Sequence, residues 1–178
     1  EAKNPSVMNE LIAKKEETIR KLKKNLPRMQ EMYKYAEPIQ EAEILQGIAG
    51  IKTFNEMVLS KLKKGDVFYI LGAPKEANEF LGAYFQDWHE RRVKKGIYCK
   101  ILYNWDAKEL AEKRRKTPLT EIKFLPEHIK TPALIDMGKD YIATLLFGER
   151  PLCIVIKNKK IYESYLTYFE ILWKTAKK

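Results

Sequence analysis

The chain has 178 residues, of which 45% are hydrophobic and 33% charged, which excludes disordered and collagen-like classes and fits a protein with its own core. Lysine and arginine number 34 against 24 acidic residues, a net charge of +10, so an acidic or phosphate-bearing partner is chemically reasonable. No apolar run reaches the ~18 residues that span a membrane, and no signal-peptide core is present. We therefore expect a cytoplasmic protein, with no membrane partner and with reduced cysteines at Cys99 and Cys153.

Residues 6–36 have the pattern of a long coiled-coil helix. From Ile19 on, apolar residues alternate three and four positions apart, and charged residues fill the other faces, which is heptad spacing. Pro27 should kink or split this helix, because proline lacks the amide hydrogen. The alternative to pairing is packing on the chain's own domain. We predict that residues 1–36 form a dimerisation helix that pairs with a second copy through Ile12, Ile19, Leu22, Leu26, Met29 and Tyr33.

Residues 37–178 predict an α/β domain, in which strands and helices alternate after Glu37-Pro38. Gly138-Lys139-Asp140 predicts a hairpin, so the sheet is mixed rather than purely parallel. The predicted strands cover residues 42–48, 67–71, 97–103, 119–125, 133–137, 141–147 and 152–156, and the predicted helices cover 50–64, 75–95, 106–116 and 161–176.

Catalytic motifs are absent from the sequence. None of the three serines lies in a Gly-x-Ser-x-Gly elbow, and His89 and Glu90 are adjacent rather than three or four apart as metal ligands on a helix need. A Cys–His pair would require the fold to bring a cysteine to a histidine. Asp136 interrupts an apolar strand and either faces solvent or is a carboxyl group in apolar surroundings. We predict no catalytic residue, no metal and no cofactor.

A candidate binding site follows from the ends of two predicted strands. Gly72-Ala73-Pro74 and Tyr103-Asn104-Trp105-Asp106 follow them directly, and ligands bind beyond the carboxyl ends of strands in open α/β sheets. Glycine lets a ligand approach the backbone, Asn and Asp offer hydrogen bonds, and aromatic rings stack on a sugar or a base. The alternative is an ordinary turn in which Asn and Asp cap a helix. The predicted ligand residues are Gly72, Ala73, His89, Tyr103, Asn104 and Asp106.

A basic stretch runs from residue 91 to residue 116 and holds ten lysines and arginines. It could contact nucleic acid, or its arginines could simply suit helix ends. No helix-turn-helix, zinc-finger or RNA-stacking motif accompanies it.

Several segments together resemble the TrmB-type transcriptional regulators of archaea: residues 44–52, residues 85–104, the strand at 118–122, and residues 151–156 before an aromatic closing helix that ends at Trp173-Lys174. The resemblance covers nearly all of residues 6–176. Members of this family have a winged helix-turn-helix, then a coiled-coil dimerisation helix, then an effector domain with a phospholipase-D-like fold. The resemblance implies that this chain is the last two parts, which would explain a start at Glu1, and that DNA is bound only through the missing first part. Because some members sense sugars, a sugar is the first candidate effector.

Active phospholipase-D enzymes carry a His-x-Lys-x4-Asp motif. The best alignment places Met137-Gly138-Lys139 where those enzymes have Asp-Gly-Lys, so the nucleophile position falls on Lys130 and the lysine position on Pro132. Neither side chain can do that chemistry, and fold alone does not imply activity. We therefore predict a degenerate phospholipase-D-like fold in a non-enzymatic, effector-sensing and dimerising region of a transcriptional regulator. A divergent phosphodiesterase or nuclease that uses the basic stretch is the alternative.

Overall fold

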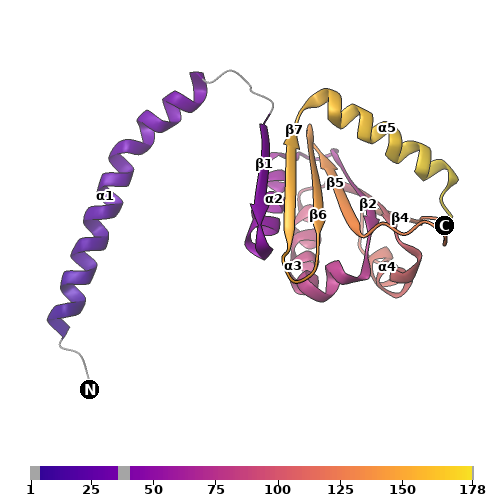
Figure 1. The fold of residues 1–178 in the computed structure, drawn as a ribbon, viewed down its shortest axis with the longest axis horizontal. Coiled ribbons are helices and arrows are strands. Elements are labelled where there is room, and N and C mark those ends of the chain that lie inside the picture. Colours follow the sequence, from indigo (N-terminus) through magenta and orange to yellow (C-terminus); the bar gives the residue numbers. More distant parts are fainter. Residues whose placement is uncertain (1–4, 36–40, 178) are drawn as a thin grey trace. The chain divides into compact units, whose positions relative to one another are not determined.

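The computed structural model describes the backbone of residues 5–35 and 41–177. The chain divides into two compact units, Glu1–Ile39 and Gln40–Lys178. In the first unit, α1 (Pro5–Tyr35) is a single helix that passes through Pro27 without being split (Figure 1). Proline removes one hydrogen bond from a helix, and the other hydrogen bonds of a helix this long hold it together across the gap.

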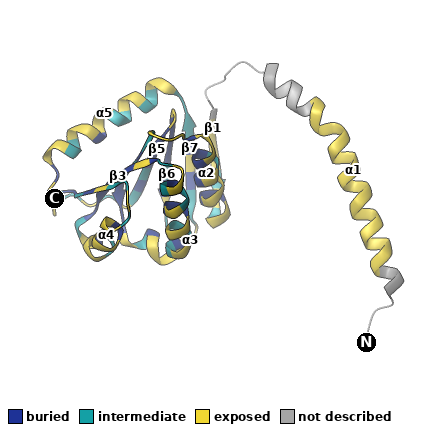
Figure 2. Ribbon diagram, turned by 180° about the vertical axis from the view of Figure 1, so that it is seen from behind, coloured by how far each residue is buried: buried dark blue, intermediate teal, exposed yellow. Residues whose placement is uncertain are grey.

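The apolar stripe of α1 is exposed along its described length (Figure 2). Ile12, Ile19, Leu22 and Leu26 are 52%, 50%, 64% and 51% exposed. The side chains of Met29 and Tyr33 lie outside the described residues. The long helix is therefore present, while its pairing with a second copy stays a prediction.

The second unit is built on one mixed sheet of seven strands, in the order β1-β7-β6-β5-β2-β3-β4. Strands β2, β3 and β4 pair in parallel, and all the other pairings are antiparallel. The predicted mixed sheet flanked by helices is confirmed. The strands are β1 (Glu41–Gln46), β2 (Val67–Ala73), β3 (Tyr98–Tyr103), β4 (Thr120–Phe124), β5 (Ala133–Gly138), β6 (Tyr141–Leu146) and β7 (Leu152–Lys157); the helices are α2 (Gly47–Lys61), α3 (Lys75–Lys94), α4 (Lys108–Arg115) and α5 (Lys159–Thr175), and a 3-10 turn, η1, covers Trp105–Ala107.

Apolar cores lie on both faces of the sheet. The larger core packs α2, α3 and α4 against one face and includes Phe54, Phe68 and Trp88. The smaller core lies under α5 on the other face and includes Met137 and Phe169 (Figure 1). Burying an aromatic side chain of this kind stabilises the fold by about 2–3 kcal/mol. The two cores therefore hold the helices against the sheet, and the candidate site lies between these layers.

Most element boundaries differ from the prediction by one to three residues, and two of these differences have a clear local cause. The predicted strand 42–48 ends at Gln46, and α2 begins at Gly47, where φ is +70°. Glycine adopts this conformation without steric cost, and the Gly47 amide donates a hydrogen bond to the Pro151 carbonyl at 2.7 Å. The predicted helix 106–116 begins as the 3-10 turn η1 before α4. The hairpin is confirmed, with both Lys139 and Asp140 at positive φ between β5 and β6, as a tight two-residue turn requires.

Candidate functional site

The ends of β2 and β3 are covered by the loop that precedes β5. Asn104 donates from Nδ2 to the Thr131 carbonyl at 2.8 Å, and the Thr131 amide and hydroxyl both donate to Asn104 Oδ1, at 3.3 and 3.1 Å. Gly72 has φ +74°, and a Cβ at this position would collide with Thr131 Oγ1. The space that the glycine leaves is therefore filled by Thr131 in this structure.

Asp106 contacts the same loop. Its Oδ2 lies 2.6 Å from Nζ of Lys130, and this hydrogen bond raises the pKa of the Lys130 ammonium. Three predicted ligand residues, Gly72, Asn104 and Asp106, thus fasten the loop over the strand ends. The other three, Ala73, His89 and Tyr103, line a cavity on the face of the sheet that α2, α3 and α4 cover. Ligand binding by either group stays a prediction.

The cavity has a volume of about 180 Å³ and lies between the sheet and helices α3 and α4. Exposed side chains line its outer end, among them Asn78 and Gln86 of α3 and Lys113 of α4. Its interior is mostly apolar, and one carboxyl group faces it from the sheet. The apolar and aromatic wall consists of Phe68, Ile70, Phe85, Trp88, Ile101, Leu110 and Leu134.

Asp136 is the carboxyl group inside the cavity. It is 3% exposed, and its Oδ1 has no hydrogen-bond partner. Burial raises the pKa of Asp136 well above its ordinary value, because a charged carboxylate loses hydration there. From the sequence alone, this side chain could have faced either solvent or an apolar interior. Its strand alternates so that Leu134 and Asp136 face α3 and α4, and an unpaired buried carboxyl group of this kind marks a candidate functional residue.

His89 faces the same cavity from α3. It is 4% exposed, and its Nδ1 accepts a hydrogen bond from Nε of Arg92 at 3.2 Å. An accepting Nδ1 places the ring proton on Nε2. Burial, followed by the charges of Arg114 and Arg92, lowers the pKa of His89 well below its ordinary value. The imidazole is therefore neutral at physiological pH. Because it is buried, it is also a poor candidate for a nucleophile that a substrate must reach.

Arg92 is fully buried next to His89 and holds the end of α3 to the neighbouring strands. Its Nη1 donates to the carbonyls of Ile97 and Leu119 at 2.6 and 3.0 Å, and its Nη2 donates to Thr120 Oγ1 at 2.7 Å. Burial lowers the pKa of this guanidinium. The carbonyl dipoles compensate in part for the lost hydration, so Arg92 has a structural role.

Arg114 of α4 supplies a cationic group to the cavity, which Lys113 of the same helix also lines. The residue is 9% exposed, and its Nη1 donates to Gln86 Oε1 at 3.2 Å. Among the residues that the structure describes, no carboxylate forms an ion pair with it. Burial raises the pKa of Tyr103, and Arg114 opposes that rise, which places the guanidinium beside β3. Sequence reasoning missed Arg114 and Gln86, because nothing in a charged helix marks which residue turns inward.

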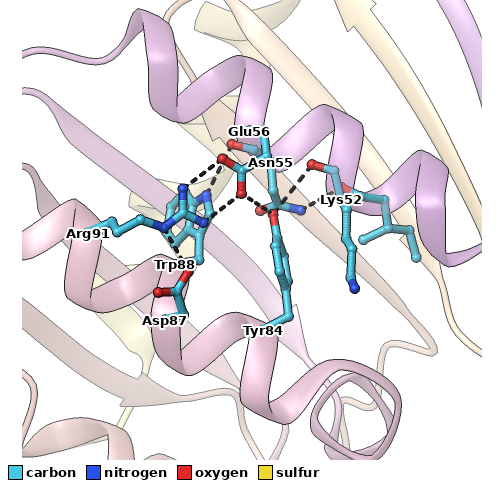
Figure 3. A network of polar contacts seen from close by, with 8 residues as sticks. Lys52, Asn55, Glu56, Tyr84, Asp87, Trp88 and Arg91 are labelled. Carbon is cyan, nitrogen blue, oxygen red and sulfur yellow. Dashed lines mark hydrogen bonds and ion pairs between the residues drawn. The ribbon is translucent and has the colours of Figure 1, made fainter.

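Helices α2 and α3 are joined by a polar network at the edge of the cavity (Figure 3). Arg91 donates from Nη1 and Nη2 to the two carboxylate oxygens of Glu56, at 2.7 and 2.6 Å, and from Nε to Asp87 at 2.7 Å. Tyr84 donates to Glu56 at 2.9 Å, and Trp88 donates from Nε1 to the Asn55 carbonyl at 3.1 Å. This network joins α2 to α3 next to Asn55 and Trp88, which line the cavity.

The basic stretch from residue 91 to residue 116 is divided among several structural tasks. Arg91 joins the α2–α3 network, Arg92 is buried, Arg114 faces the cavity, and Arg115 pairs with Glu112 at 3.2 Å. Lys95 donates to the Leu59 carbonyl at 2.5 Å. The arginines of this stretch do not form one continuous cationic surface, which weakens the case for nucleic-acid binding by it.

No group of His, Cys, Asp and Glu suited to a metal ion occurs within the described residues. Among the same residues, no helix is both long enough and apolar enough to cross a membrane.

Comparisons by sequence find no matching family model and no match among curated proteins. Solved structures are similar in fold at low identity. TrmBL2, described as an archaeal chromatin protein with a novel mode of DNA binding, has a TM-score of 0.58 and 16% identity, covering 97% of this chain. This chain spans 65% of the length of TrmBL2, just under two thirds.

Two further solved structures are similar over a smaller share of this chain. NucT from Helicobacter pylori has a TM-score of 0.60 and 8% identity, and covers 78% of this chain and 98% of its own. Nuc from Salmonella typhimurium, a phospholipase D family member, has a TM-score of 0.55 and 12% identity, and covers 78% of this chain and 97% of its own. At these identities the likeness shows a phospholipase-D-like fold.

Proposed function

We propose that the chain is the effector-sensing and dimerisation region of a TrmB-type transcriptional regulator. The observation that carries the proposal is coverage: the match to TrmBL2 extends over 97% of this chain, whereas the matches to NucT and Nuc extend over 78%. A match that extends over nearly the whole chain must take in most of α1, which is the segment that the resemblance assigns to dimerisation. DNA would be bound through a winged helix-turn-helix domain that these 178 residues do not include.

The positions aligned with the phospholipase-D motif support a non-enzymatic role. Lys130, at the nucleophile position, is an exposed side chain paired with Asp106, and the lysine position is Pro132. A phosphoryl-transfer site needs a nucleophile and a group that holds the phosphate within reach of each other. Neither Lys130 nor Pro132 supplies these functions.

The proposed mechanism couples the cavity to the arrangement of the helices. A small effector would occupy the cavity between the sheet and α3, whose helical path is broken at Leu81 (φ −136°, ψ 21°), beside the cavity-lining Gly82. An effector shifts such an equilibrium only through different affinities for the two arrangements, and a tenfold effect needs about 1.4 kcal/mol. The paired α1 helices would then reposition the DNA-binding domains.

Sedimentation and thermal unfolding of the 178-residue chain test this proposal together. We expect a dimer, and we expect at least one compound in a screen of sugars, nucleotides and amino acids to raise the melting temperature, because a ligand that binds only the folded state stabilises it. A monomer at all concentrations would refute the dimerisation role. A broad screen without a stabilising compound would refute the sensing role.

A divergent phosphodiesterase or nuclease is the second candidate, favoured by the 97–98% coverage of the NucT and Nuc chains. It predicts hydrolysis of a chromogenic phosphodiester that disappears on His89→Ala or on His128→Ala. Hydrolysis no faster than buffer would exclude it.

Direct DNA binding by these 178 residues predicts a gel shift that weakens steeply with salt, because each phosphate contact releases counterions. No shift at low salt would exclude that alternative.

A further inference from the structure

We propose that the cavity between β2, β3, β5 and helices α3 and α4 binds a small zwitterion, namely an α-amino acid with an apolar side chain. The ammonium group of the ligand would pair with Asp136, and its carboxylate would pair with Arg114. This inference rests on the proposed sensing function and narrows its effector to one chemical class.

The first observation is that the two ionisable groups proposed to bind the ligand, Asp136 and Arg114, both lack a charged partner. Asp136 Oδ1 is buried without a hydrogen bond, and Arg114 forms no ion pair within the described residues. A buried polar group left unpaired costs about 1–3 kcal/mol. A ligand that brings a cation to Asp136 and an anion to Arg114 would satisfy both groups at once, whereas an uncharged polyol would leave the charge of Arg114 uncompensated.

Asp136 and Arg114 line the same cavity from different elements, β5 and α4, as binding of the two charged groups of an α-amino acid requires. Asp136 lies on β5, and the guanidinium of Arg114 acts on Tyr103 and Cys99 of β3, with β2 between these strands. The amino nitrogen and carboxyl carbon of an α-amino acid are about 2.5 Å apart. With a charge-assisted hydrogen bond of about 2.8 Å at each end, the ligand bridges about 8–9 Å.

The volume and the walls set the size and polarity of the rest of the ligand. A cavity of about 150 Å³ holds benzene, so about 180 Å³ fits a ligand of the size of valine or leucine better than a hexose. Phe68, Ile70, Trp88 and Leu134 would surround an aliphatic side chain. The ligand would enter at the outer end, beside Asn78 and Gln86.

Binding should also release a proton. Burial favours the protonated form of Asp136, and an ammonium group next to it would favour the carboxylate, so the proton would leave to the buffer. The charge change occurs at Asp136 because the neighbouring groups resist it: His89 is neutral, and the pKa values of both cysteines and of Tyr103 are raised. The titratable and charged groups near this carboxyl are Cys99 and Tyr103 on β3, Cys153 on β7, His89 and Arg92 on α3, and Lys113 and Arg114 on α4.

Calorimetry and thermal unfolding of the full 178-residue chain with L-leucine test the inference. We expect L-leucine to raise the melting temperature, and 4-methylpentanoate and 3-methylbutylamine, which lack the ammonium and the carboxylate, to bind at least about tenfold more weakly. In buffers of different ionisation enthalpy, binding should release up to one proton. If the two single-charge analogues bind as tightly as L-leucine, or if binding of L-leucine releases no proton, the inference is wrong.

Matched variants locate the ligand. Asp136→Asn should remove the preference for L-leucine over 4-methylpentanoate, and Arg114→Gln should remove the preference over 3-methylbutylamine. Asp140→Asn and Arg115→Gln, at exposed positions outside the cavity, should leave both preferences unchanged. If Arg114→Gln fails to fold, Ala77→Leu, which would fill the cavity from α3, should abolish binding. Undiminished binding to Ala77→Leu would refute the location.

The inference and the proposed function fail differently. If maltose or another sugar raises the melting temperature and L-leucine does not, the sensing function stands and the zwitterion inference is wrong. If no compound binds, both are wrong.

Discussion

Along α1, apolar side chains are exposed to solvent, whereas in the sheet unit a polar side chain is buried without a partner. Leu22 of the helix is 64% exposed, and Asp136 of β5 is 3% exposed. Both arrangements are unfavourable in an isolated chain: the first leaves apolar area in water, and the second removes a carboxyl group from water without compensation. The comparison teaches that a second copy of the chain would relieve one cost and a small ligand would relieve the other.

The largest expected effect concerns the exposed apolar side chains of α1. Leu22→Asp with Leu26→Asp should convert a dimer into a monomer, because each change places a charge in the apolar seam of a coiled coil. Sedimentation velocity over a concentration series measures the change. Arg20→Asp with Lys24→Asp, which alters the outer faces of the same turns, should remain dimeric. If the two double variants behave alike, the seam is not the interface.

The next effect tests whether the sheet unit depends on its buried cation. Arg92→Met should lower the free energy of unfolding by on the order of 3 kcal/mol, because the carbonyls of Ile97 and Leu119 lose a charged donor. Urea denaturation measures this loss. The control is Arg115→Met, where the arginine is 38% exposed and paired with Glu112; it should cost less than about 1 kcal/mol.

A smaller effect, of opposite sign, sharpens the comparison at Asp136. Its pKa is raised in the folded state, so between about pH 4, the unfolded value, and the folded value the native state keeps a proton that the unfolded chain has lost. Stability therefore falls as pH rises, by at most about 1.4 kcal/mol per pH unit. Asp136→Asn removes this loss, and the variant should become more stable than the parent as pH rises.

Urea denaturation at pH 4, 5.5, 7 and 8 checks the slope for Asp136→Asn. Asp140→Asn, at an exposed turn position where Asn tolerates positive φ, should track the parent at every pH. A stability difference that stays constant with pH would mean that Asp136 is already ionised in the folded protein.

The smallest effect concerns the α2–α3 network. The hydrogen bond from Arg91, followed by that from Tyr84, lowers the pKa of Glu56, so the stability it contributes is present above about pH 4.5 and is lost as pH falls through the folded pKa. Because both partners are more than a third exposed, Glu56→Gln should cost less than about 1 kcal/mol at pH 7, and this cost should shrink as pH falls through the folded pKa. The control is Glu112→Gln, which affects an ion pair within one helix. If the two variants lose the same free energy of unfolding, the α2–α3 network contributes no more to stability than that pair does.

The layered fold was predictable because periodicity is local. Apolar runs such as 67–71 and 152–156 mark buried strands, and the turn at Lys139-Asp140 marks a hairpin, so the mixed sheet follows from sequence alone. The strand ends were less predictable. Gly72 signals a close approach to the backbone, but only the fold shows that Thr131, far along the chain, is the group that approaches.

The candidate cavity could be predicted only in part. Ala73, His89 and Tyr103 were singled out from strand ends and from a helix face, and all three line it. Asp136 carried a signal, a single acidic residue within an apolar strand, yet alternation alone did not say which face it occupied. Arg114 carried none, because an inward-facing arginine in a helix of charged residues depends on how α4 packs.

The break of α3 at Leu81 has a consequence for how fast the cavity exchanges its contents. Residues 75–80 before the break form a helical piece too short to be stable by itself, and Ala77 and Asn78 within it line the cavity. Local unfolding of a few residues costs far less than global unfolding. We expect amide hydrogens of this piece to exchange with solvent well before those of Trp88 and Arg92 further along the same helix, and an occupied cavity to slow that exchange selectively.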